Sequence, residues 1–301
     1  MRYTKLFDPD IPSEPVSGEA DGVGADGRVY AFDEETVLAV NVALATGRPL
    51  LVSGPPGSGK SSLAPNVARI MGCRYYSVVV TARTEDTDLL WREEVLRRLS
   101  DAQHGALRPP DGSGIDPYCQ PGPLWMALDP EKDLALPADR RRRRAVLLID
   151  EIDKADPDFP NALLVPLGEL RFAGPGGTPV TVDPATERPL VVVTTNEERA
   201  LSVPFLRRCI ALRLKPPTQE HLLRVAELHL GDDLDRDLAG QLADHLLEGF
   251  SAHRVGVAST AEYLDTLRAC RRLALRSDSP LWRTVADLAM IKTGFASEGL
   301  L

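Results

Sequence analysis

The chain has 301 residues, with 35 basic and 44 acidic side chains and a formal net charge of −9 at pH 7. This acidic balance argues against a general nucleic-acid binder, and the aromatic content of 5% argues against a surface that stacks bases. No apolar run approaches the roughly 20 residues of a membrane-spanning helix, so the sequence predicts no membrane segment. The 43% of hydrophobic residues suffice for a large core, and at about 150 residues per domain the length predicts one large domain with a smaller one.

The cellular compartment is predicted from the N-terminus and the cysteines. The first residues lead into Asp8, Pro9 and Asp10 rather than into the apolar region of a signal peptide. The four cysteines are scattered, with no pair at the spacing of a metal site: Cys73, Cys119, Cys209 and Cys270. We therefore expect reduced, mostly structural thiols in a cytoplasmic protein.

The N-terminal segment is expected to form a flexible arm over residues 1–27. Residues 8–27 are rich in Asp, Pro, Ser and Gly, a composition that buries too little apolar surface to fix its own conformation. Order is expected to begin near Arg28. Asp33 has the character of a helix N-cap, and Gly47 is placed to end that helix.

Five short apolar segments predict the strands of one sheet. They lie at residues 50–53, 75–80, 145–150, 190–195 and 209–214, with helical stretches and loops between them. Near-continuous apolar strands that alternate with helices are typical of a parallel sheet covered on both faces. The sequence thus predicts an α/β domain over residues 28–215 with a five-stranded, mainly parallel sheet.

Beyond Pro216 and Pro217 the pattern becomes helical. Leucines recur at helical spacing from Leu234 to Leu246, and Ser259 with Glu262 forms a capping box. Residues 216–301 therefore predict a small all-helical domain. Within the α/β domain, residues 102–139 are rich in Pro and Gly and are expected to form a long irregular connection.

The segment after the first predicted strand fits the phosphate-binding pattern G-x-x-x-x-G-K-[ST] at every fixed position. Its residues are Gly54, Pro55, Pro56, Gly57, Ser58, Gly59, Lys60 and Ser61, followed by Ser62. The glycines let backbone N–H groups turn toward a phosphate, and the helix that opens at Lys60 directs its positive dipole end to the same place. Lys60 adds a full charge, and the Ser61 hydroxyl is a ligand for Mg²⁺.

The third strand ends in two carboxylates, Asp150 and Glu151. Carboxyl ends of parallel strands lie at one edge of a sheet, so both side chains are expected beside the phosphate loop. There Asp150 can hold Mg²⁺ through water, and Glu151 can polarise an attacking water as general base. Taken alone, acidic residues at this position also cap helices.

Two further features follow the later strands. Asn196 ends the fourth strand, where it can bind the attacking water or serve only as a turn residue. Arg207 and Arg208 directly precede the fifth strand. They can form salt bridges on their own surface, or in a ring they can reach the site of a neighbouring subunit and stabilise transition-state charge.

This order of motifs resembles the AAA+ ATPases and, more narrowly, the MoxR family. The resemblance covers residues 28–215, and its most specific segment is Ile149–Leu170, where Lys154-Ala155-Asp156 and Phe159-Pro160-Asn161 follow the two carboxylates. It implies a P-loop core with a C-terminal helical lid. It also implies Walker A at 54–61, Walker B at Asp150 and Glu151, sensor 1 at Asn196, and an arginine finger at Arg208, with Arg207 as second choice.

The resemblance further implies ATP and Mg²⁺ as ligands and a homo-oligomeric, commonly hexameric ring. Such rings couple ATP hydrolysis to the remodelling of a partner protein, and their companions often carry von Willebrand factor A domains. Two other functions stay open at the level of the sequence. One is a nucleotide-gated scaffold with little turnover, and the other, less favoured by the acidic composition, is an ATPase stimulated by nucleic acid.

Two features depart from this picture or add to it. Related proteins have a sensor 2 arginine in the first turn of a lid helix, where this chain has Ala261; Arg254 or Arg268 are the substitutes nearby. Coupling of hydrolysis to lid movement is therefore open. The run Arg140–Arg144 is interpreted as a solvated loop or a contact to an acidic neighbour rather than as a nucleic-acid site.

Overall fold

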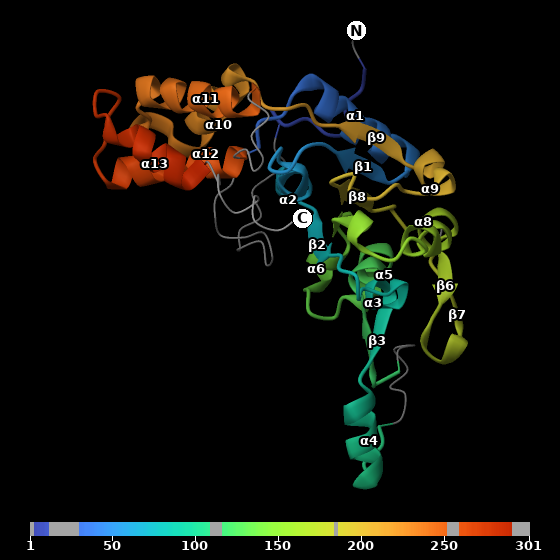
Figure 1. The fold of residues 1–301 in the computed structure, drawn as a ribbon. Coiled ribbons are helices and arrows are strands. Elements are labelled where there is room, and N and C mark those ends of the chain that lie inside the picture. Colours follow the sequence, from blue (N-terminus) through green and yellow to red (C-terminus); the bar gives the residue numbers. More distant parts are fainter. Residues whose placement is uncertain (1–2, 12–29, 109–115, 184–185, 252–258, 291–301) are drawn as a thin grey trace, which may run out of the picture. The chain divides into compact units, whose positions relative to one another are not determined.

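Five strands of the computed structural model form one sheet in the order β2-β5-β8-β1-β9, of which β2, β8, β1 and β9 are labelled in Figure 1. The structure describes residues 3–11, 30–108, 116–183, 186–251 and 259–290. The strands are β1 (Leu50–Ser53), β2 (Arg74–Val79), β5 (Ala145–Asp150), β8 (Leu190–Thr195) and β9 (Ile210–Arg213). The predicted five-stranded sheet is confirmed, with β2 one residue earlier than expected and β9 one residue shorter at each end.

The inner strands run parallel and are buried on both faces. Parallel ladders join β2 to β5, β5 to β8, and β8 to β1. All six residues of β8 and the first five of β5 are buried, which explains their near-continuous apolar sequence. The register pairs Ile149 with Val193 and Ser53 with Thr195, so β5, β8 and β1 end at the same edge of the sheet.

Helices and two small two-stranded sheets make up the rest of the described elements. The helices of its first two thirds are α1 (Glu34–Thr46), α2 (Lys60–Met71), α3 (Asp86–Leu90), α4 (Val95–Gln103), α5 (Pro123–Leu128), α6 (Ala138–Arg141), α7 (Phe159–Ala162), α8 (Leu164–Glu169) and α9 (Val203–Arg208). The two small antiparallel sheets pair β3 (Trp91–Glu93) with β4 (Cys119–Pro121) and β6 (Arg171–Ala173) with β7 (Pro179–Thr181). The last third holds α10 (Gln219–Leu230), α11 (Arg236–Ser251), α12 (Thr260–Arg272) and α13 (Leu281–Met290).

The chain divides into two compact units. One contains Glu34–Ser53 and Val67–Leu212 with the described part of the N-terminal segment, and therefore the whole of β1, β2, β5 and β8. The other contains Gly54–Asn66 and the helical region that begins at Arg213. The phosphate loop, expected within an α/β domain over residues 28–215, thus groups with the helical unit.

The helical unit has its own core. Leu222 of α10, Leu242 of α11, Tyr263 of α12 and Trp282 of α13 are buried in one cluster. Helix α12 begins with the predicted capping box, in which the Ser259 hydroxyl accepts the Glu262 N–H and the Glu262 carboxylate accepts the Ser259 N–H. Across the residues described, no helix is both long and apolar enough to cross a membrane.

Part of the expected N-terminal arm is anchored to α1. Phe7 is buried, and the side chain of Asn41 accepts hydrogen bonds from the N–H groups of Leu6 and Phe7 at 2.6 and 2.9 Å. The same amide donates to the carbonyls of Phe7 and Val37, both at 2.8 Å. Residues 3–11 are therefore held in place, whereas residues 12–27 lie outside the described part of the chain.

The long irregular connection expected over residues 102–139 contains regular elements in its described part. Of its described residues, those before 109 include the end of α4, and those after 115 form β4, α5, a 3-10 turn and the start of α6. Leu124 and Trp125 are buried in the core, where α5 packs against β2 and β5. These two side chains therefore offer no exposed surface for a substrate or partner.

The run Arg140–Arg144 has intramolecular partners. Arg141 pairs with Glu131 at 3.5 Å, Arg144 pairs with Glu187, and Arg143 donates to the carbonyl of Gly72 at 3.2 Å. These contacts support the interpretation of the run as a bridge to acidic groups. All four cysteines are free, and burial raises the pKa of Cys73 and Cys209 to about 11, as expected of structural thiols.

Candidate functional site

The phosphate-binding pattern folds as a loop that leads into α2, which begins at Lys60 as expected. Gly57 and Gly59 have φ values of +72° and +89°, a left-handed conformation that side chains disfavour. The buried Lys60 ammonium donates to the loop's own carbonyls, to Gly54 at 2.8 Å and to Pro55 at 2.9 Å. Two carbonyls of the loop thus hold the Lys60 ammonium against the loop's own backbone.

The same loop packs against the start of α12 within the helical unit. A Cβ atom added to Gly57 would lie 1.7 Å from Cβ of Ser259, so no larger residue fits there. The carbonyl of Gly57 accepts the N–H of Thr260 at 3.3 Å. On another side, the ring of Tyr30 would lie 3.2 Å from a Cβ at Gly59, and burial raises the pKa of Tyr30. The shape of the loop is therefore fixed by neighbours on two sides.

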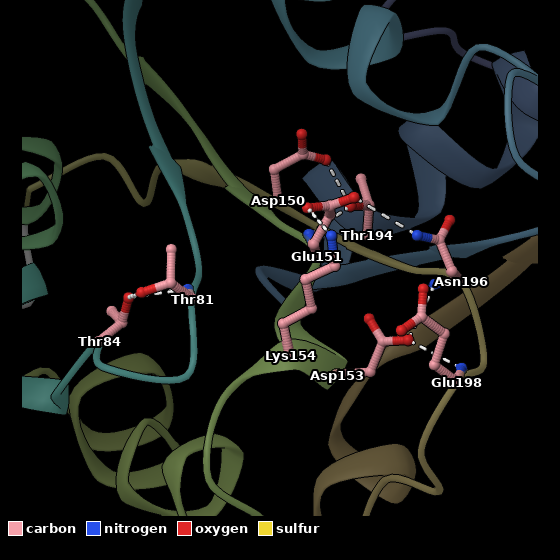
Figure 2. A network of polar contacts seen from close by, with 9 residues as sticks. All are labelled: Thr81, Thr84, Asp150, Glu151, Asp153, Lys154, Thr194, Asn196 and Glu198. Atoms are coloured by element: carbon pink, nitrogen blue, oxygen red, sulfur yellow. Dashed lines mark hydrogen bonds and ion pairs between the residues drawn. The ribbon is translucent and has the colours of Figure 1, made fainter. Parts of the chain in front are cut away.

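In the sheet unit, the predicted carboxylates meet the end of β8 (Figure 2). The Thr194 hydroxyl donates to Oδ1 of Asp150 at 2.5 Å and accepts the N–H of Glu151 at 2.8 Å. Glu151 has φ +60° and ψ 48°, a left-handed conformation that costs a non-glycine residue about 1–3 kcal/mol. Because Glu151 leaves the extended geometry, both carboxylates turn toward β8 instead of pointing to opposite faces.

The Glu151 carboxylate has a partner at each oxygen. Oε2 accepts from Nζ of Lys154 at 2.8 Å, and Oε1 lies 3.4 Å from Nδ2 of Asn196. This hydrogen bond with Glu151 raises the pKa of Lys154. The structure therefore brings together Glu151 and Asn196, as the sequence predicts, and adds a lysine to the pair.

A second acidic side chain fixes the turn that carries Asn196. Oδ2 of the buried Asp153 accepts the N–H groups of Asn196 at 3.2 Å and Glu198 at 2.9 Å (Figure 2). Between these two residues, Glu197 adopts a left-handed conformation with φ +60°. Asp153 thus compensates the strain of the turn and sets the backbone from which the Asn196 side chain extends.

The arginines Arg207 and Arg208 end the short helix α9, and both side chains are exposed. In the part of the chain that the structure describes, neither guanidinium forms a salt bridge, so the alternative of a salt-bridged pair receives no support. Val203 and Leu206 on the same helix are also exposed, at 57% and 43%. Helix α9 therefore presents apolar and cationic side chains together at the surface of its unit.

Comparison with known families supports the same reading of the motifs. The model of the AAA domain (dynein-related subfamily) matches residues 49–212, which is more than half of the chain. The chain belongs to this family. A mitochondrial Lon protease homolog from Phaeodactylum tricornutum is 27% identical over 247 residues, which are 76% of this chain and 24% of the relative. The chain thus spans about a quarter of that relative's length.

Solved structures agree with the AAA+ fold. Two RuvB variants from Thermotoga maritima are similar to this chain, with TM-scores of 0.50 and 0.51 and sequence identities of 16% and 15%. Each match covers 85% of this chain and 68% or 67% of the RuvB chain. At these identities the similarity concerns the P-loop fold, with its sheet and its C-terminal helical region.

The lid position at which the resemblance implies a sensor 2 arginine holds an alanine in this chain. Ala261 lies in the first turn of α12, next to the residues that contact the phosphate loop. Of the two substitutes, Arg268 is engaged with Asp265 at 3.1 Å, and Arg254 lies outside the described residues. Within the described residues of α12, no arginine occupies its first turn.

The residues of this AAA domain fit Mg²⁺ by the chemistry of their donors. Mg²⁺ needs only one or two protein ligands beside phosphates and water, so a cluster of three carboxylates is not required, and none occurs among the described residues. Asp150 and Ser61 are oxygen ligands of the correct kind. The Ser58 hydroxyl in the phosphate loop is buried without a hydrogen-bond partner, as expected of a loop built to receive a polar ligand.

Three residues of this region were not predicted from the sequence: Thr194, Asp153 and Lys154. Thr194 could have been predicted from the sequence, because an apolar strand that becomes polar before its last residue places a hydroxyl beside the end of the neighbouring strand. The roles of Asp153 and Lys154 depend on the left-handed backbone conformations of Glu151 and Glu197. No local sequence pattern predicts these conformations.

Proposed function

We propose that this chain is a Mg²⁺-dependent ATPase that converts ATP and water to ADP and phosphate in a homo-oligomeric ring. One observation carries the proposal: Asp150, Glu151, Thr194 and Asn196 converge at one edge of the sheet. Strand β1 ends at that edge, since Ser53 pairs with Thr195. The phosphate loop begins at the next residue along the chain.

The proposed roles follow from the chemistry of each side chain. The N–H groups from Gly54 to Ser62 and the Lys60 ammonium bind the phosphates, and Ser61 and Asp150 hold Mg²⁺. When bound, Mg²⁺ neutralises charge on the phosphates. Glu151 accepts the proton of the attacking water, which Asn196 orients by a hydrogen bond. Thr194 donates a hydrogen bond to Asp150 and so directs that carboxylate.

An arginine of the adjacent subunit completes the site in this proposal. Arg208, with Arg207 as the second candidate, is exposed and has no ion-pair partner among the described residues. Such a group can enter a neighbouring site and stabilise the charge that develops on the transferred phosphoryl group. A ring, commonly hexameric, supplies one such arginine to every site.

The partner is proposed to be a protein that the ring remodels in a chaperone-like manner. This follows from the MoxR resemblance of the segment Ile149–Leu170, and a companion with a von Willebrand factor A domain is the first candidate. The net charge of −9 and the intramolecular contacts of Arg141, Arg143 and Arg144 disfavour nucleic acid as the partner. A cytoplasmic location belongs to the same proposal.

Phosphate release measured across a range of protein concentrations tests the proposal. Because Arg208 acts in trans, specific activity should rise steeply with concentration as the ring assembles. Arg208→Ala should lower turnover by about a thousandfold or more, while ATP binding is kept. No release at any concentration would instead support a nucleotide-gated scaffold. Stimulation by DNA or RNA would support the nucleic-acid motor.

A further inference from the structure

One arginine from the loop between α1 and β1 binds the end of helix α9. The guanidinium of Arg48 donates to the carbonyls of three successive residues, 207–209, at 2.5, 3.1 and 2.8 Å. The next residue, Pro49, accepts the N–H of Ile210 at 2.8 Å. Two adjacent residues therefore hold the end of α9 and the start of β9 through both donor and acceptor groups.

Helix α9 depends on such contacts. It has six residues, too few to be stable alone, and Phe205 is its only buried side chain. Its N-terminus is fixed by Ser202, whose hydroxyl accepts the Phe205 N–H and contacts Asn161. The last carbonyls of a helix have no partner within the helix, and a cation there also matches the helix dipole. Arg48 supplies both the donors and the charge at this end.

The held backbone is the part from which the two candidate finger arginines extend. Both side chains are exposed, so the backbone of residues 207–208 is what sets the point and the direction from which they leave their own subunit. We propose that Arg48 is a positioning residue that orients the arginine finger toward the adjacent subunit, an inference that rests on the proposed function. Among the described residues, the hydrogen bonds of the Arg48 guanidinium go to backbone carbonyls at the end of α9, so its proposed action on the site passes through that backbone.

The position of Arg48 in the chain connects the arginine finger to the subunit's own phosphate loop. Arg48 immediately precedes Pro49 and strand β1, and β1 leads into the phosphate loop. Strand β1, which leads into the subunit's own phosphate loop, therefore follows directly on the residue that holds the backbone of the proposed finger arginine.

ATPase kinetics of Arg48→Ala and Arg48→Lys provide the first test. Arg48→Ala should lower kcat by about 10- to 100-fold, the cost of misplacing a catalytic group, with little change in KM or in affinity for a fluorescent ATP analogue. Arg48→Lys should recover part of the loss, because the ammonium keeps the charge without the planar fork. Arg236→Ala, which removes an exposed ion pair with Glu227, serves as the matched control and should behave as wild type.

Mixing experiments distinguish a defect in the arginine finger, which acts in the adjacent subunit's site, from a defect in the subunit's own site. Glu151→Gln subunits cannot hydrolyse ATP but carry an intact finger, so adding them to Arg48→Ala should restore turnover in the Arg48→Ala sites. Adding Arg208→Ala to Arg48→Ala should restore nothing, because neither variant lends a well-placed finger. Rescue by Glu151→Gln without rescue by Arg208→Ala is expected only if Arg48 acts on the site of the neighbouring subunit. A merely structural role of Arg48 would not produce this combination of results.

Each outcome decides between the proposals. If wild-type protein hydrolyses ATP and Arg208→Ala abolishes turnover while Arg48→Ala keeps it, the role of Arg48 is overturned and the proposed function stands. If Glu151→Gln fails to rescue Arg48→Ala, the defect lies in cis and the positioning role is again overturned. If the wild type shows no turnover at any concentration, both proposals fail together.

Discussion

The hydroxyl of Thr194 lies 2.5 Å from Oδ1 of Asp150 and donates a hydrogen bond to it. The Thr194 hydroxyl oxygen also accepts the N–H of Glu151, so one threonine contacts both carboxylate residues at the end of β5. Thr194 is almost fully buried, and the parallel register that pairs Ile149 with Val193 brings it level with Asp150. The two strands thus fix the direction of the proposed metal ligand.

Thr194→Val should weaken the Mg²⁺ dependence of ATP hydrolysis. The substitution keeps the shape of the side chain but removes the donor to Asp150, and loss of a group that orients a metal ligand typically costs about 10- to 100-fold in metal affinity or activity. Titration of phosphate release with MgCl₂ measures the effect. Thr194→Ser keeps the hydroxyl and should remain near wild type; an unchanged Mg²⁺ titration for Thr194→Val would remove Thr194 from the site.

Glu151→Gln and Lys60→Ala should separate turnover from binding. The glutamine cannot accept a proton, so turnover should fall by about 100-fold or more while ATP binding is kept. Lys60→Ala removes the buried cation of the phosphate loop and should lose binding as well as turnover. Equilibrium binding of a fluorescent ATP analogue and phosphate release measure the two properties. Wild-type hydrolysis by Glu151→Gln would show that another group is the base.

If Glu151 is the base as proposed, Lys154 competes with the attacking water for its carboxylate. Its ammonium occupies Oε2 of that carboxylate at 2.8 Å, in a partly exposed ion pair that water and salt weaken. Lys154→Met should therefore raise basal kcat by about two- to five-fold, within the range for exposed pairs. Lys154→Arg keeps the pair and should match the wild type. Loss of turnover in Lys154→Met would mean that the lysine assists hydrolysis.

The sequence predicts the sheet and the main functional motifs because both depend on local patterns. Five apolar segments become the five strands, and β1, β5 and β8 have the predicted bounds. Asp150, Glu151 and Asn196 meet because strands of one parallel sheet end at one edge. Chain order and strand direction suffice for that conclusion.

The contacts that orient Asp150, Glu151 and Asn196 depend on backbone turns that the sequence does not predict. Glu151 and Glu197 adopt left-handed conformations without being glycine, and Asp153 and Lys154 reach their partners only through those turns. Residues 102–139 were expected to lack regular structure because Pro and Gly dominate the pattern. There, the buried Leu124 and Trp125 instead stabilise a helix of six residues through tertiary packing.

Asn41→Leu should destabilise the protein and release residues 3–11. The Asn41 amide satisfies two N–H groups and two carbonyls, and its loss leaves the N–H groups of Leu6 and Phe7 without an acceptor. An unsatisfied buried donor costs about 1–3 kcal/mol, so the free energy of unfolding in urea should fall by about 2 kcal/mol or more. Leu38→Ala, exposed on the same helix, should change it by about 0.5 kcal/mol or less.

Hydrogen exchange tests the second half of that prediction. The amides of Leu6 and Phe7 should exchange much faster in Asn41→Leu than in wild type, because their acceptor is gone. Equal exchange rates in the two proteins would show that the burial of Phe7 alone anchors this segment.

His221 should make the stability of the protein fall with decreasing pH. Burial is the main cause that lowers the pKa of His221 below its ordinary value of 6.5, and Arg224 adds to this effect while Asp33 opposes it. In the unfolded chain the ring takes up a proton near the ordinary value, while in the folded protein it stays neutral to lower pH. The unfolded state therefore binds more protons below about pH 6.5, and stability is lost as the pH falls toward the folded pKa.

The urea midpoint of unfolding, compared at about pH 7.5 and about pH 5.5, measures the pH effect of His221. The midpoint should fall between the two values in wild type and fall less in His221→Gln, whose side chain does not titrate. His104→Gln removes an exposed histidine at the end of α4 and should keep the wild-type difference. A wild-type pH difference that persists in full in His221→Gln would assign the effect to other groups, because the neutral amide cannot take up the proton that the argument requires.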